Sequence, residues 1–324
     1  MTKENKLIGG LTLVSLICLV VAYFAPIWWV SLTAPNYPAD AFPDGIRIHF
    51  HFDGVYNGCK AAGKGTRMAN EIIQKDLSHE DERYNPITDA NKDHNKGAEG
   101  LDCVHEMNTI NHYVGMFPIA SGAPVEKPLA KFFFGFFGVM LAAFAMTGKK
   151  ARISVLTAGF TAVAGWMIVD QFVMGKLASH VTYYMAETAT FFNEPDKIKV
   201  WGDNVMSISK IVIFGLIGVM AVVIAATAMI RSFQLLLALV PALLPVFFVI
   251  TYAGWLWFFG HNLHPWGAFT VKPFMPTVFG EGKVAQFSTY SYPYWGYGLL
   301  MVIFVCMMLA LLIRRKQLRD GQAE

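Results

Sequence analysis

The chain carries little charge for its size. Only 15% of its 324 residues are Asp, Glu, Lys or Arg, whereas soluble domains average about 25%. The charge that is present falls between long stretches that carry almost none, and 55% of all residues are hydrophobic. This segregation excludes an ordinary soluble protein and indicates that lipid is the solvent for the apolar stretches.

Several motifs that would identify a chemistry are also absent from the sequence. The four cysteines form no CxxC pair and no CxxCH sequence, which argues against a thioredoxin-like dithiol and covalently attached haem. No Walker A sequence, nucleophile elbow or zinc motif occurs, so we expect neither a bound nucleotide nor an enzyme. No basic run is interleaved with aromatic residues, so nucleic acid is not an expected partner.

Six apolar stretches are each long enough to cross a bilayer, which takes about 20 residues. They cover residues 7–30, 129–147, 153–174, 209–230, 233–259 and 295–313. We therefore predict an all-α membrane protein, a six-helix transmembrane bundle whose large periplasmic loops contain a little β structure. The first stretch ends in aromatic residues rather than at a small-residue cleavage site, which indicates an uncleaved anchor. Pro241 and Pro245 should kink the fifth stretch.

Basic residues between the stretches predict the orientation. The Lys and Arg residues of the short connectors and of both ends fall on one side under a six-span count, and cytoplasmic flanks are enriched in these residues. We expect a multi-pass protein of the bacterial inner membrane with both termini in the cytoplasm. The chain then divides into an anchor (residues 1–30), a periplasmic region (31–128) and a five-span bundle (129–324) with periplasmic loops at 175–208 and 260–294.

The first periplasmic region is too long to be a simple connector. Within it, Arg47–Phe52 alternates apolar and polar residues, which predicts a short strand. Residues 60–100 are polar and indicate a flexible or inserted segment. Cys59 and Cys103 flank that segment, and in an oxidising compartment such a pair forms a disulfide. The alternative is that Cys103 binds copper together with neighbouring residues.

All nine histidines fall on the predicted periplasmic side. Imidazole and sulfur ligands suit copper, so copper is the metal that this side would hold. The candidate ligands are His49, His51, His105, Met107, His112, Met116, His261 and His264. No spacing among them forms a closed metal motif, and a structural role for each residue is the alternative.

Asp170 is the ionisable residue that we single out within the predicted spans. It lies about one turn from the outer end of the third span, and a carboxylate at membrane depth is a functional candidate by default. Together with the aromatic span ends it would frame a quinone-binding pocket. The alternative is that its side chain only reaches the membrane surface.

Three groups of segments resemble a known family. They are Ala34–Pro38, then Asn108–Ile119 with its Asn-x-x-Asn-His-Tyr core, and then His261–Pro265 with Pro276–Gly280 and Phe287–Tyr292. They resemble the polytopic membrane protein encoded in nitrous oxide reductase gene clusters. The polar segment at 60–100 and Phe117, where the family pattern has a basic residue, depart from it. These departures leave open a paralogue that serves another copper oxidoreductase, such as an ammonia or methane monooxygenase.

The resemblance implies an accessory or assembly membrane protein of denitrification. Such a protein would dock or support a copper oxidoreductase and handle its copper. Two alternatives stay open: a quinol-interacting or electron-transfer membrane subunit, and a purely structural subunit of a larger membrane complex. An electron-transfer subunit would depend on its partners, because no histidine pair lies in the spans to bind haem and no iron–sulfur pattern occurs.

Overall fold

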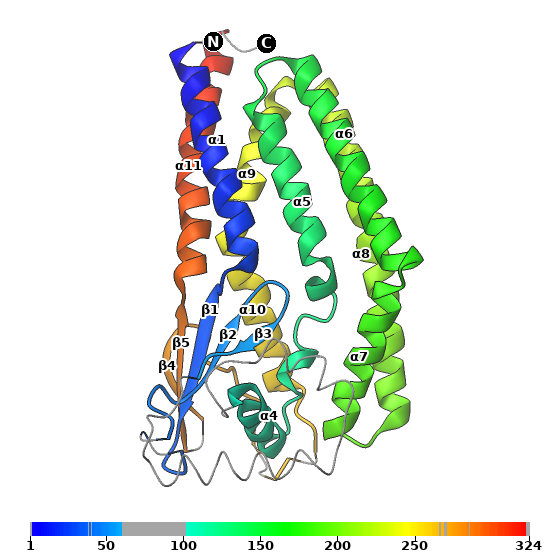
Figure 1. Ribbon diagram of the computed structural model, residues 1–324, viewed down its shortest axis with the longest axis vertical. Helices are drawn as coiled ribbons and strands as arrows, with labels where there is room; N and C mark the ends of the chain where they lie inside the picture. Colours follow the sequence, from blue (N-terminus) through cyan, green and yellow to red (C-terminus); the bar gives the residue numbers. More distant parts are fainter. Residues whose placement is uncertain are drawn as a thin grey trace.

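The computed structural model describes residues 2–37, 39, 41–59, 102–265, 267–268, 271–284 and 286–321. In this part of the chain, six helices are long and apolar enough to cross a membrane. Both termini lie at one end of the helices, the terminal end, and a small β-sheet lies at the other, the sheet end (Figure 1). The predicted helical bundle with a little β structure is confirmed to this extent. The polar segment predicted over residues 60–100 lies outside the described residues.

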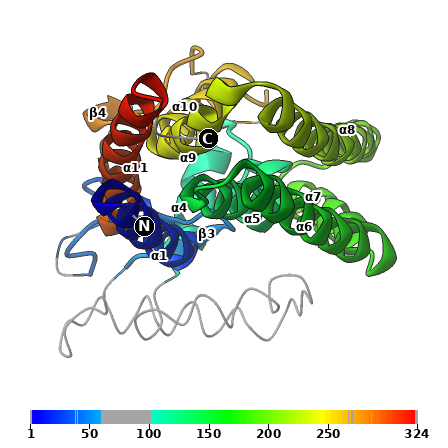
Figure 2. The same cartoon turned by 90° about the horizontal axis from the view of Figure 1, so that it is seen from above.

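The bundle has a central group of helices and an extension on one side (Figure 2). The central group packs α1 (Lys3–Phe24), α5 (Glu126–Ala145), α9 (Leu236–Ala242) and α11 (Trp295–Arg319) against one another. The extension is formed by α6 (Lys149–Ile168), which packs on α5, and by α8 (Pro195–Met229), which packs on α6. Apolar side chains fill the central seams, as expected for helices that are apolar along their length.

The fifth predicted span is interrupted. It comprises the 3-10 helix η3 (Arg231–Leu235), then α9, and then α10 (Leu244–His261). The interruption falls at Leu243, between two prolines that lack an N–H donor and disfavour a continuous helix. The predicted kink is therefore confirmed, and the helix is broken at this point into α9 and α10.

The sheet has five antiparallel strands in the order β3-β2-β1-β5-β4. They are β1 (Trp28–Thr33), β2 (Ile46–Phe50), β3 (Val55–Asn57), β4 (Gly280–Val284) and β5 (Phe287–Pro293). The strand predicted near residues 47–52 is confirmed as β2. The first predicted span is corrected, because α1 ends at Phe24 and the next residues turn into the central strand of the sheet.

Trp28 connects the sheet to the helices through a hydrogen bond and through ring contacts. Its Nε1 donates a hydrogen bond to Ser291 Oγ at 2.9 Å, and that hydroxyl donates to the carbonyl of Val278. The buried indole also packs against the rings of Phe248 in α10 and Tyr297 in α11. Burying a tryptophan removes a large apolar area from solvent, so this side chain holds the two layers together.

Helix α4 (Cys103–Val114) packs against β2 and β3. Asp102 caps its first turn by accepting from the backbone N–H groups of Val104 and His105. A disulfide joins Cys59, just after β3, to Cys103 at the start of the helix. The predicted disulfide is confirmed, and the sulfur of Cys103 is therefore not available as the copper ligand that was the alternative.

Residues 175–208, predicted as a periplasmic loop between two spans, are largely helical. A π-helical turn, η2 (Val169–Val173), continues α6, and Gly175 at φ +67° turns the chain into α7 (Lys176–Phe191). Helix α8 then runs for 35 residues, about 52 Å at 1.5 Å per residue, and packs against α7 at the sheet end. The sequence contained a pattern that indicates α7, because the apolar residues Leu177, Val181 and Tyr184 recur at helical spacing. All three are buried in the structure.

Candidate functional site

A cavity of about 440 Å³ lies between α5 and α10. Helix α5 packs against α9 at the terminal end, but beyond the interruption at Leu243 the next helix no longer packs closely on it. The space between them is closed at the sheet end by residues 116–123 and by the turn between β2 and β3. The interruption of the fifth span therefore opens the cavity.

Aromatic rings form a large part of its walls. Helix α5 contributes Phe133, Phe134 and Phe137, and α10 contributes Phe248 and Tyr252 among others. Phe133 and Phe137, like Phe248 and Tyr252, are four residues apart, so each pair lies on one face of its helix. The walls suit an apolar molecule with a flat or flexible body.

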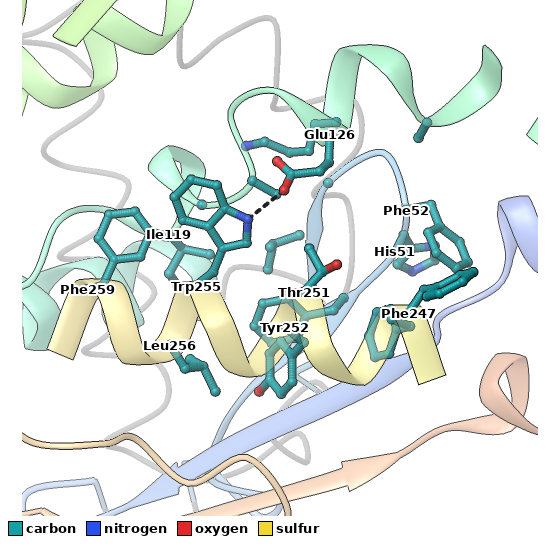
Figure 3. A pocket seen from close by; sticks show the side chains of 18 of the residues that line it. His51, Phe52, Ile119, Glu126, Phe247, Thr251, Tyr252, Trp255, Leu256 and Phe259 are labelled. Carbon is teal, nitrogen blue, oxygen red and sulfur yellow. Dashed lines mark hydrogen bonds between the residues drawn. The ribbon is translucent and has the colours of Figure 1, made fainter. Parts of the chain in front are cut away.

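Polar groups gather at the start of α5. Figure 3 shows Trp255 of α10 donating through Nε1 to Glu126 Oε1 at 3.0 Å. The other carboxylate oxygen, Glu126 Oε2, is buried and accepts no hydrogen bond from the residues that the structure describes. Lys127 lines the same end of the cavity and interacts electrostatically with Glu126 and Glu187. A buried oxygen that accepts no hydrogen bond costs free energy, so Oε2 is suited to accept a hydrogen bond from a bound molecule.

His51 supplies a second polar group from the turn after β2 (Figure 3). Burial lowers the pKa of this histidine, and the nearby Asp53 only partly opposes that effect. The imidazole is therefore neutral near pH 7 and retains an acceptor nitrogen. Its ring packs on Tyr56 with centroids 4.4 Å apart.

The predicted copper ligands are spread over β2 and the turn after it, α4 and the segment after it, and α10 and the loop that follows it. No group of three or more His, Cys, Asp or Glu side chains suited to a metal occurs within the described residues. His51 and Met116 line the cavity. His49 stacks on Tyr294 at 5.0 Å, and His261 stacks on Trp257 at 4.6 Å.

In the alternative to the disulfide, Cys103 would bind copper together with His105 and Met107, but these residues lie on a helix. Successive residues of a helix are rotated by about 100°, so residues two apart point in different directions. His105 is exposed, whereas Met107 is buried beneath the sheet. Residues two apart share a face in a β-strand, so the spacing of His105 and Met107 would place their side chains together only on a strand.

His112 and His264 both contact the ring of Phe192, with centroids 5.9 and 4.1 Å away. His264 is buried and donates through Nε2 to Glu194 Oε2 at 3.0 Å. This link joins the loop after α10 to the start of α8. It lies beside a smaller cavity of about 220 Å³, which shares the side chain of Phe117 with the larger one.

Asp170 does not line the cavity. Its Oδ2 lies 2.7 Å from Lys131 Nζ of α5 and accepts a hydrogen bond from Gln171 at 2.7 Å. The carboxylate, in the π-helical turn η2, therefore ties α6 to α5. Lys131 also lies in a predicted span, so two charged residues pair at this depth.

Sequence reasoning also missed Glu126, Lys127 and Trp255. The phenylalanine-rich segment 132–137 indicated the wall formed by α5. No local pattern indicated the wall formed by α10. Glu126 and Trp255 are 129 residues apart, and only the fold brings them together. A carboxylate at the first turn of an apolar helix was the one available signal, and it resembles an ordinary helix start.

His49 gives a prediction for pH dependence. Burial, helped by Arg47 and His51, lowers the pKa of His49 from 6.5 to about 4, so the unfolded chain binds more protons than the folded one between these values. The free energy of unfolding should therefore fall by about 1–2 kcal/mol on acidification from about pH 7 to about pH 5. Melting temperatures across this range should show a shallower dependence in His49→Gln. An unchanged dependence in that variant would contradict the assignment.

The described part of the chain contains six apolar helices of membrane length, a small sheet at one end, and an aromatic cavity with a charged end. Comparisons with protein-family models, with curated proteins and with solved structures find no match. The functional argument therefore depends on the geometry of the cavity.

Proposed function

We propose that the protein is a membrane subunit that binds a quinol-class amphiphile and supports a periplasmic copper oxidoreductase. The observation that carries the first part is the cavity between α5 and α10, with aromatic walls and a buried carboxylate oxygen that lacks a donor among the described residues. Its volume lies within the range of small-molecule sites.

The chemistry of the charged end favours a ring that bears hydroxyl groups. A carboxylate oxygen and a neutral imidazole accept hydrogen bonds, and a hydroquinone headgroup offers two O–H donors. A phospholipid phosphate would need cations, but Lys127, a cation of the lining, already interacts with two carboxylates. The phenylalanine walls would hold the ring and the start of an isoprenoid tail.

The second part of the proposal rests on the resemblance and on the distribution of charge. The basic flanks favour a bacterial inner membrane with cytoplasmic termini, which would put the sheet end in the periplasm. A periplasmic copper oxidoreductase, such as a nitrous oxide reductase, would then meet the protein at that end. The proposal does not extend to copper handling, which no group of three or more His, Cys, Asp or Glu side chains in the described part of the chain supports.

Binding of decylubiquinol to the purified protein tests the proposal. Phe247 lines the cavity and is 41% exposed, so Phe247→Ala should weaken binding by up to about 10-fold with little effect on folding. Ala130 is buried in the wall, and Ala130→Phe should abolish binding by filling the space.

Phe214→Ala is the matched control, because Phe214 is exposed on α8 and stacks on Phe172, outside the cavity lining. It should bind as the wild type does. The proposal fails if both cavity variants bind decylubiquinol normally. It also fails if the native protein copurifies with phospholipid that decylubiquinol cannot displace.

A further inference from the structure

Beyond the charged end of the cavity lies another carboxylate, that of Glu187. Binding of a headgroup does not require this residue. Lys127 lines the cavity and interacts with Glu187 of α7 as well as with Glu126. Glu187 is only 9% exposed. Helix α7 is held at this place by the hydroxyls of Ser121 and Thr188, 3.4 Å apart.

The surroundings of Glu187 favour exchange of a proton. Burial raises the pKa of its carboxyl, while a hydrogen bond from Tyr183 and the charge of Lys127 oppose that rise. His180, on the same helix, bonds to the carbonyl of Pro124 at 2.7 Å. Burial and the neighbouring Lys127 lower the pKa of His180 to about 4, so it adds no charge near neutral pH. Among the described residues, Lys127 of α5 and Tyr183 of α7 act on the Glu187 carboxylate.

We propose that Glu126, Lys127 and Glu187 form a proton exit from the cavity to the compartment at the sheet end. The inference rests on the proposed function. It assigns a separate role to each residue: Glu126 accepts a proton from the bound headgroup, Lys127 transfers it, and Glu187 delivers it to water. Aliphatic or aromatic packing alone does not require a half-buried lysine that interacts electrostatically with two carboxylates.

The oxidant is an external one-electron acceptor protein of the copper or haem class. For each electron that it removes from the bound hydroquinone, one ring O–H bond breaks and a new O–H bond forms at Glu126 Oε2. The Lys127 ammonium gives a proton to Glu187 and then takes the proton from Glu126, which restores both charges. Glu187 releases its proton to water. Two rounds convert the hydroquinone to the quinone, with two electrons passed to the acceptor and two protons released.

A single-turnover experiment tests this path. Decylubiquinol bound to the protein in liposomes is oxidised by a photoexcited ruthenium complex, while quinone formation is followed by absorbance and proton appearance by a pH-indicating dye. Glu187→Gln should bind decylubiquinol with wild-type affinity, whereas the appearance of protons should slow at least about 100-fold. Glu187→Asp, which keeps the carboxylate, should restore most of the rate.

Asp196→Asn is the matched control, because Asp196 is exposed in the first turn of α8 and should release protons at the wild-type rate. If Glu187→Gln does not fold, Lys127→Gln replaces it with the same expected slowing. Wild-type proton release in either variant, with binding intact, would overturn the proton exit alone. Absence of decylubiquinol binding to the wild type would instead overturn the proposed function on which the exit rests.

Discussion

Cys103→Ser is expected to destabilise the sheet-end structure by about 4 kcal/mol. The disulfide joins residues 44 apart in sequence, and closing a loop of that length removes about this much conformational free energy from the unfolded chain. The loss should be local, because the cross-link connects β3 to α4 and not the membrane-length helices to one another.

Proteolysis and thermal unfolding would both detect this loss. The serine variant should be cut within the sheet-end region at protease concentrations that the wild type resists, and its first melting transition should move to lower temperature. Cys306→Ser is the matched control, since Cys306 is a free cysteine in α11. Equal stability of the two variants would show that the cross-link contributes little.

Asp170→Asn is expected to cost about 2–3 kcal/mol. The substitution leaves Lys131 without its carboxylate partner at 2.7 Å, and breaking one side of a buried ion pair costs about 3–5 kcal/mol. The expected value is below that range because the lysine side chain is 31% exposed, so solvent compensates part of its charge. The melting temperature in detergent would measure the loss.

The double variant Asp170→Asn with Lys131→Met should recover much of that stability, because no uncompensated charge then stays at this depth. Binding of decylubiquinol should be unchanged in Asp170→Asn, since Asp170 does not line the cavity. Weaker binding at unchanged stability would instead favour the quinone-pocket role that the sequence suggested for this residue.

The spans could be predicted because membrane solvation acts locally. About 20 consecutive apolar residues suffice to identify a span whatever the rest of the chain does. Each of the six predicted stretches overlaps one of the membrane-length helices, and the fifth stretch includes most of α10. The same local rule failed at residues 25–30. These residues are as apolar as the helix before them, but Trp28 and Trp29 pair with strands that lie elsewhere in the sequence.

The candidate site could be predicted only in part, because it depends on contacts between distant segments. His51 and Met116, which the sequence suggested as metal ligands, line the cavity. Asp170 attracted attention because an isolated carboxylate at membrane depth is conspicuous, yet its partner Lys131 accounts for it. Glu126 was not selected, because its role depends on the position of α10 relative to α5. No local sequence pattern indicates that position.

The order of the strands has a consequence for biosynthesis. The central strand β1 emerges early from the ribosome, but its partner β5 follows only much later, since Trp28 and its hydrogen-bond acceptor Ser291 are 263 residues apart. Until then one edge of β1 exposes unpaired backbone groups that invite association with other chains. The sheet can be completed only after most of the polypeptide has been synthesised, so a chain that stops before β5 leaves an open edge that cellular quality control can recognise.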